Sequence, residues 1–192
     1  MSVTPSEMLE LGTKAPDFEL PDTKGNRVTL DQFEDAEVLV VVFMCNHCPF
    51  VKHVREEIVN IANDFKEKGV EFVAINSNDV ENHPEDSPQQ MAIEAEKFDY
   101  PFPYLYDESQ EVAKKYRAAC TPDFFVFDKD RKLSYRGQMD DSRPGNDEPL
   151  NGRDLRNALD TILEGEEITE EQKPSMGCNI KWKPGNAPEY AR

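Results

Sequence analysis

Hydrophobic positions in the first half of the chain follow two different periods, and these periods predict a strand, a helix and a second strand. Residues 38–44 and 70–76 are continuous runs of mostly β-branched and aromatic side chains, typical of strands buried on both faces of a parallel sheet. Between them, apolar residues recur every three or four positions from 48 to 68, which predicts an amphipathic helix ending at Gly69. This order predicts a right-handed β-α-β unit.

Weaker signals on either side of this unit predict the remaining elements. Apolar residues flanking a polar turn at 22–26 favour a short hairpin within 12–35. Ser87, Pro88 and Gln90 have the pattern of a helix N-cap, a first-turn proline and a capping box, which predicts a helix to about residue 98. The other expected elements are an irregular approach to 104–106, a short helix at 109–116, a hairpin of strands at 124–127 and 132–136, and a last helix from about 153.

The pattern changes after residue 164, where the apolar periodicity fades and three prolines interrupt the remaining chain. We therefore expect one domain over residues 1–166 and an extended C-terminal tail over residues 167–192. We expect this tail to wrap the domain and its end to be disordered. A chain of 192 residues is long enough for one domain to bury its own core.

The net charge of the chain makes negatively charged partners unfavourable. The formal net charge is −17, so the chain should repel nucleic acid and anionic membrane surfaces, and we expect neither as a partner. The simplest explanation of the acidity is solubility. Because the sequence shows neither a basic and apolar leader nor an apolar run of about 20 residues, we expect a cytoplasmic protein.

Two of the four cysteines, Cys45 and Cys48, lie where the first buried strand gives way to the following helix. A helix N-terminus favours a thiolate because its N–H groups are unpaired and its dipole is positive there. A Cys-x-x-Cys motif in this position is typical of disulfide exchange. We expect Cys45 to be the exposed nucleophile and Cys48, one turn inside the helix, to be the resolving thiol. An imidazolium at His47 should lower the pKa of Cys45 below the ordinary value of about 8.5.

A metal site is the main alternative for this cysteine pair. Structural zinc normally needs two further ligands, and the sequence contains no second Cys-x-x-Cys and no His-x-x-x-His motif. The remaining candidate ligands are Cys120, Cys178, His53 and His83. Otherwise we expect His53 to be solvated or packed and His83 to be incidental in a polar loop.

The order of elements around the Cys-x-x-Cys motif, followed by Thr121-Pro122 before a strand, resembles the thioredoxin fold. The segment 12–18 (GTKAPDF) and the hairpin after it resemble the redoxin branch of that superfamily, which contains peroxiredoxins and thiol–disulfide reductases. The resemblance covers roughly residues 8–165, and the tail segment 175–182 (SMGCNIKW) resembles a subgroup of uncharacterised thioredoxin-like proteins. It implies an α/β fold with a central mixed sheet flanked by helices, an N-terminal β-hairpin and an extended C-terminal tail.

The resemblance also implies roles for particular residues. Pro122 should be cis and face the cysteine pair, and the backbone of Thr121 should pair with an extended substrate chain. Cys120 should lie near the site, and Cys120 and Cys178 are possible extra redox thiols. The strand at 38–43 departs from the thioredoxin pattern because it holds no carboxylate to accept the proton of the resolving thiol.

These observations predict a thiol–disulfide oxidoreductase that acts through the Cys45–Cys48 dithiol and needs no cofactor beyond this redox-active disulfide. Its partners would be a protein or small-molecule disulfide and an unidentified electron donor. The first alternative is a peroxiredoxin-like thiol peroxidase with antioxidant activity, in which Cys48 is peroxidatic and Cys45 replaces the threonine of the family motif. The second alternative is a metal-binding or carrier module that uses Cys45 and Cys48.

Overall fold

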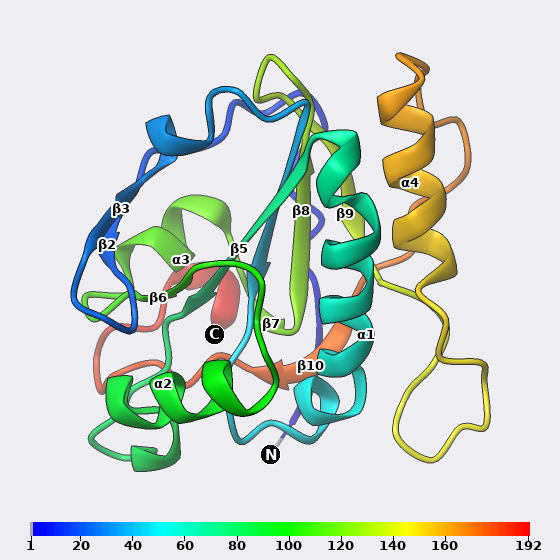
Figure 1. Ribbon diagram of the computed structural model, residues 1–192. Coiled ribbons are helices and arrows are strands. Elements are labelled where there is room, and N and C mark those ends of the chain that lie inside the picture. The colour runs from blue at the N-terminus through cyan, green and yellow to red at the C-terminus, as the bar shows by residue number, and fades with distance from the viewer. Residues whose placement is uncertain (1) are drawn as a thin grey trace.

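A five-stranded mixed sheet forms the centre of the protein, for which the computed structural model describes residues 2–192 (Figure 1). The strand order is β6-β5-β4-β8-β9. The three strands β4, β5 and β6 are parallel, whereas β8 runs antiparallel to β4 and β9 antiparallel to β8. The bounds are β4 (Val38–Phe43), β5 (Val70–Asn76), β6 (Tyr104–Tyr106), β8 (Asp123–Phe127) and β9 (Leu133–Gly137). The mixed thioredoxin-like sheet expected from the sequence is thereby confirmed.

Helices cover both faces of this sheet, which explains why β4 reads as an unbroken apolar run. Alternate residues of β4 point into two separate cores: Val38, Val40 and Val42 into one, and Leu39, Val41 and Phe43 into the other. The first core is covered by α1 (Pro49–Phe65), α2 (Pro88–Lys97) and α4 (Arg153–Leu163). The second is covered by α3 (Glu111–Tyr116) and by the predicted N-terminal hairpin, β2 (Glu19–Pro21) and β3 (Arg27–Thr29). The short 3-10 helices are η1 (Leu30–Phe33), η2 (Lys66–Lys68), η3 (Pro84–Asp86) and η4 (Glu189–Ala191).

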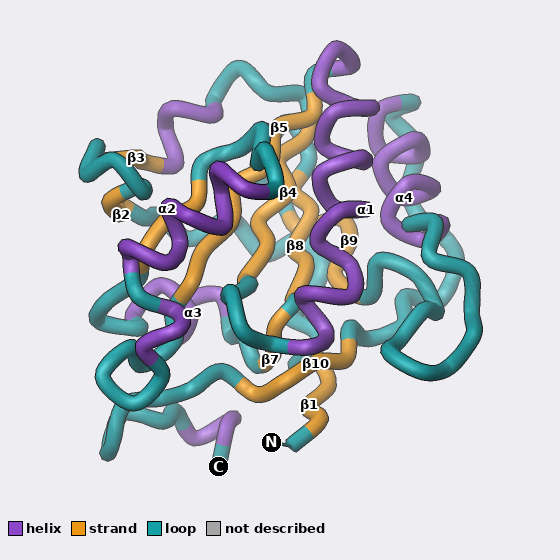
Figure 2. The backbone as a smooth tube through the Cα atoms, turned by 60° about the horizontal axis from the view of Figure 1, so that its bottom comes forward, coloured by secondary structure: helices purple, strands orange, loops and turns teal. Residues whose placement is uncertain are grey.

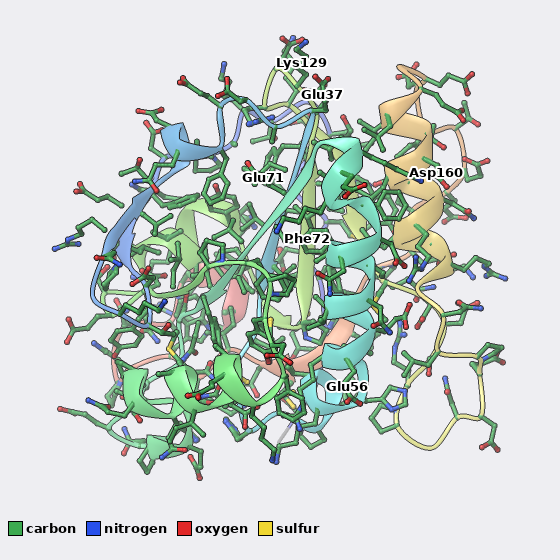
Figure 3. All side chains as sticks on the ribbon, in the orientation of Figure 1. Glu37, Glu56, Glu71, Phe72, Lys129 and Asp160 are labelled. Carbon is green, nitrogen blue, oxygen red and sulfur yellow. The ribbon has the colours of Figure 1, made fainter. Side chains whose placement is uncertain are left out.

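The two ends of the central sheet differ in character. At one end the exposed side chains of Glu37 and Lys129 approach to 3.8 Å, and Figure 3 shows them together above the strands. At the opposite end lie the N-terminus of α1 and a second, three-stranded sheet (Figure 2). The chain therefore places its Cys-x-x-Cys motif beside this second sheet.

The second sheet joins both termini of the chain to the segment before β8. Its order is β1-β10-β7, made of β1 (Val3–Pro5), β10 (Met176–Asn179) and β7 (Cys120–Thr121), all antiparallel. The sequence pattern predicted an extended tail here but none of these three strands. The end of the tail was expected to be disordered; instead it forms η4, where the Tyr190 hydroxyl donates to the Ala118 carbonyl at 2.9 Å.

Candidate active site

The Cys-x-x-Cys motif occupies the connection from β4 to α1. The Met44 N–H donates to the Ile75 carbonyl at 3.0 Å, which continues the pairing with β5 for one residue beyond β4. Cys48 is the N-cap of α1 with extended backbone angles (φ −66°, ψ 126°), and Pro49 follows in the first turn. Proline is favoured there because its missing N–H has no partner in a helix anyway. Cys48 therefore lies at the mouth of the helix, and the expectation that it lies one turn inside is wrong.

Thr121 is the residue that contacts both sulfurs. The Thr121–Pro122 peptide bond is cis, as the family resemblance implied. The Thr121 Oγ1 atom lies 3.6 Å from the Sγ of Cys45, and the Thr121 carbonyl oxygen lies 3.4 Å from the Sγ of Cys48. The segment before β8 therefore contacts both cysteines of the motif, although it is more than 70 residues from the motif in sequence.

Cys45 was expected to be the exposed nucleophile with a lowered pKa, and the structure corrects both points. Its residue is only 1% exposed. Burial raises the pKa of the Cys45 thiol well above its ordinary value, and a hydrogen bond to Cys48 and the negative charge of Asp86 raise it further. Any stabilisation of a Cys45 thiolate by His47 is therefore outweighed.

The side chain of His47 is engaged by Asp86 instead. His47 Nδ1 and Asp86 Oδ2 are 2.5 Å apart, and this hydrogen bond raises the pKa of His47. Against the effect of burial, hydrogen bonds from His47 and Asn78 lower the pKa of Asp86, so the two groups form an ion pair. Asp86 also accepts from the backbone N–H groups of Asn46 at 2.8 Å and His47 at 3.2 Å, and it thereby fixes the loop between the cysteines.

The surroundings of Cys48 lower its pKa, in contrast to those of Cys45. A hydrogen bond from Cys45 lowers the pKa of Cys48 to about 4, and hydrogen bonds from Cys178, Thr121 and the backbone N–H of Val51 act in the same direction against burial. The Val51 N–H belongs to the first turn of α1, where N–H groups lack intrahelical partners. The helix N-terminus thus stabilises a thiolate as the sequence predicted, but on the second cysteine.

Cys178 is brought into the site by the tail. In β10 it stands opposite Thr121 of β7, and its Sγ lies 2.7 Å from the Sγ of Cys48. Gly177 makes this close packing possible, since a Cβ there would lie 2.0 Å from the Thr121 carbonyl oxygen. The Thr121 edge, expected to bind substrate backbone, is therefore occupied by the protein's own strand.

Cys120 lies near the site but faces away from its sulfurs. Its Sγ is 3.6 Å from the Pro122 carbonyl and 4.0 Å from the Ser175 carbonyl, and burial raises its pKa well above the ordinary value. The neighbouring Asp123 is a fully buried carboxyl whose pKa burial raises to about 7. The sequence reasoning missed Asp123, although an acid at the start of the run Asp-Phe-Phe-Val-Phe was a local signal. It also missed Asp86, for which the sequence gave no local signal.

Of the metal ligands proposed from the sequence, Cys45 alone belongs to the group of potential ligands found within residues 2–192. Within residues 2–192, one group of three could hold an ion: ligand atoms of Cys45, His47 and Asp86 lie within 4.8 Å of one another. His83 stacks on the His47 ring at a centroid distance of 5.5 Å. His53 belongs elsewhere, because its Nε2 pairs with the Ser142 hydroxyl at 2.7 Å. Since His47 and Asp86 already bond to each other, an ion there would have to break their pairing.

Comparison with known proteins places this site among redox proteins. A family model described as Redoxin matches residues 10–153. A solved structure of an uncharacterised conserved protein from Geobacillus kaustophilus is 57% identical, with a TM-score of 0.94 over 96% of this chain and 98% of that one. The thiol-disulfide oxidoreductase ResA of Bacillus thuringiensis subsp. konkukian is 27% identical over 134 residues, 68% of this chain and 70% of the relative. Peroxiredoxin 2 of Picrophilus torridus is 28% identical over 109 residues, 55% of this chain and 51% of the relative.

No helix within residues 2–192 has both the length and the apolar character needed to cross a bilayer.

Proposed function

The chain belongs to the Redoxin family and is an oxidoreductase, and from that premise we propose that it catalyses thiol–disulfide exchange through Cys45 and Cys48. The observation that carries the proposal is the contact of both sulfurs with Thr121 at the N-terminus of α1, where the pKa of Cys48 is lowered. Thiolates, and not thiols, attack disulfides. The cysteines themselves carry the chemistry, as in other thiol–disulfide oxidoreductases of this fold.

The charge distribution favours Cys48 as the attacking sulfur. Its thiolate attacks one sulfur of a substrate disulfide, the substrate S–S bond breaks, and the departing thiolate takes up a proton. Cys45 then loses its proton and attacks the Cys48 sulfur of the mixed disulfide, which releases the second substrate thiol. Two electrons have passed to the substrate, and the Cys45–Cys48 disulfide remains. A dithiol donor returns two electrons by the same exchange in reverse.

The proposal is tested by reduction of a protein disulfide such as insulin, with dithiothreitol as the electron donor. We expect the wild type to accelerate the reaction and Cys48→Ser to lose the acceleration. Cys45→Ser combined with Cys178→Ser should stop after one attack and accumulate a mixed disulfide on Cys48, because neither neighbouring sulfur remains to resolve it. Cys120→Ala, a buried cysteine whose sulfur faces away from the pair, is the matched control. Wild-type rates in both active-site variants would contradict the proposal.

A second candidate function, thiol peroxidase, is favoured by the same ionised sulfur and by the similarity to a peroxiredoxin. The Cys48 thiolate would attack the O–O bond of a peroxide, giving a sulfenic acid and one molecule of water or alcohol. Condensation with a neighbouring thiol would then form a disulfide and release water. A peroxide-consumption assay on the wild type and Cys48→Ser decides it: consumption that does not depend on Cys48 would exclude this activity.

A further inference from the structure

The strand β10 occupies the position that an extended peptide would take at the site. A peptide that adds to a sheet edge gains backbone hydrogen bonds along the edge and places alternate side chains toward the protein. Here β10 pairs antiparallel with β7, with Cys178 opposite Thr121 and Asn179 opposite Cys120. The residue that stands opposite Thr121 is thus a cysteine of the same chain.

The sulfur of Cys178 lies directly beside the sulfur of Cys48. The two Sγ atoms are 2.7 Å apart, so a shift of less than 1 Å brings them to the disulfide bond length of about 2.0 Å. Cys178 is only 2% exposed and Cys48 is fully buried, so an external thiol or disulfide reaches either sulfur only after β10 moves. Cys48 therefore has two sulfur neighbours, Cys45 on the motif loop and Cys178 on β10.

The strand is held on both of its edges. On the side away from β7, β10 pairs with β1, where Cys178 stands opposite Val3. At its N-terminal side the Ser175 hydroxyl donates to the Pro122 carbonyl at 2.6 Å. These contacts hold the Cys178 sulfur against Cys48.

The charges around Cys178 change when Cys48 enters a disulfide. Burial raises the pKa of Cys178 to about 12, and the negative charge of Cys48 adds to the rise, whereas the positive charge of Lys181 opposes it. The Lys181 ammonium is held in place by the carbonyl and side chain of Asn179, at 2.8 and 3.0 Å. In a Cys45–Cys48 disulfide the opposing charge on Cys48 is gone and Lys181 remains, so ionisation of Cys178 becomes easier.

We propose that Cys178 is a third redox residue of this protein, presented by β10 as an internal substrate whose sulfur exchanges with the Cys45–Cys48 disulfide. The proposal rests on the exchange function proposed above. The Cys178 thiolate attacks the Cys48 sulfur, the Cys45–Cys48 bond breaks, and a Cys48–Cys178 bond forms. The electron pair leaves on Cys45, which takes up the proton that Cys178 lost. One disulfide and one thiol are present before and after, so the step needs no external oxidant or reductant.

The test maps disulfides in the full chain at equilibrium with glutathione buffers of increasing oxidised fraction at fixed pH. Samples are quenched with acid, alkylated, digested and analysed by mass spectrometry. We expect both the Cys45–Cys48 and Cys48–Cys178 links in the wild type, and never both in one molecule because both use Cys48. Since the two forms are isomers, their ratio should stay constant while their sum rises with the oxidised fraction. Cys178→Ser should contain Cys45–Cys48 alone, Cys45→Ser should contain Cys48–Cys178 alone, and Cys120→Ala should match the wild type.

Two outcomes separate this inference from the proposed function. A wild type that forms Cys45–Cys48 at every potential without any Cys48–Cys178 link overturns the inference and leaves the proposed function standing. A wild type and a Cys178→Ser variant that never form Cys45–Cys48 overturn both. A ratio that changes with the oxidised fraction also overturns the inference, because the two links would then not be isomers in exchange. Because these readings come from the wild type, they do not depend on whether Cys45→Ser folds.

Discussion

Cys45 and Cys48 belong to one motif and one loop, yet the protein treats their sulfurs in opposite ways. Cys45 lies buried beside the carboxylate of Asp86, which disfavours a second negative charge. Cys48 lies at the N-terminus of α1 and receives hydrogen bonds from two thiols and a backbone N–H. The difference teaches that the spacing of a Cys-x-x-Cys motif places two sulfurs together, whereas residues far away in sequence decide which of them is ionised.

The largest effects are expected when the sulfur of Cys48 or Cys45 is removed. We expect Cys48→Ser to lower the rate of disulfide reduction by at least about 100-fold, because both exchange partners bond through Cys48. In a Cys45→Ser/Cys178→Ser double variant the first attack should persist and only turnover should be lost, because no second thiol remains beside Cys48. Trapping of mixed disulfides measures the difference, and a trapped substrate on Cys45 in place of Cys48 would reverse our assignment of the two roles.

Neutralising Asp86 tests how far its negative charge contributes to the raised pKa of Cys45. Asp86→Asn should lower the pKa of His47 and also the pKa of Cys45, since a neighbouring negative charge is removed. Because the folded pKa of His47 is raised, the His47–Asp86 pair stabilises the fold below about pH 6.5, and this contribution is lost as pH rises through the raised pKa. Asp86→Asn should therefore flatten the pH dependence of unfolding in that window.

The control for this prediction is Glu85→Gln, which removes an exposed neighbouring charge with a smaller effect on His47. NMR titration of the His47 ring and thiolate absorbance at 240 nm measure the two pKa values. Equal shifts in the two variants would show that Asp86 has no specific role.

A substitution that displaces β10 tests whether this strand shields Cys48 from reagents. Gly177→Ala puts a Cβ 2.0 Å from the Thr121 carbonyl oxygen, so β10 must move, and we expect a loss of roughly 1–3 kcal/mol in the free energy of unfolding. The same shift should speed the reaction of Cys48 with a thiol reagent in the folded protein. Gly185→Ala is the control for labelling within the tail, because a Cβ there meets nothing within 4 Å and the backbone strain at its φ of +77° acts outside β10. Faster labelling in both variants, to the same degree, would refute the specific role of Gly177.

The smallest effect is expected at Cys120. Its sulfur faces the Pro122 and Ser175 carbonyls and not the reacting cluster. Cys120→Ala should therefore cost on the order of 1 kcal/mol of stability and leave the thiolate titration unchanged. Denaturant unfolding measures the stability, and absorbance at 240 nm measures the thiolate titration. A change in the thiolate pKa of Cys120→Ala would show that Cys120 interacts with the reacting cysteines.

Local signals were sufficient for the sequence to predict the central elements. The unbroken apolar runs of β4 and β5 arise because each strand is covered on both faces, and the 3.6-residue period of α1 arises because one face is covered. The Ser87 cap of α2 is formed as its pattern indicated, with the Gln90 N–H donating to the Ser87 hydroxyl at 3.3 Å. Each of these features depends on residues within a few positions of one another.

The remaining features depend on contacts that leave no period in the sequence. The strands β1, β7 and β10 have two to four residues each, and their pairing partners are more than 50 residues apart. The charge on Cys48 depends on Cys178 and the raised pKa of Cys45 depends partly on Asp86, so neither follows from the motif. The sequence therefore predicted the cysteine pair, and the family resemblance implied the cis-proline, while the tail strand and the lowered pKa of Cys48 required the structure.

The pairing of β1 with β10 has a practical consequence for anyone who purifies this protein. Val3 stands opposite Cys178, and the Asn179 N–H donates to the Ser2 carbonyl at 3.3 Å. An affinity tag at the N-terminus would thus be joined close to Ser2, which contacts β10, and we expect it to alter the reactivity of the sulfurs that β10 covers. Tags should be cleaved, or moved to the other terminus, before any potential or labelling rate is compared between laboratories.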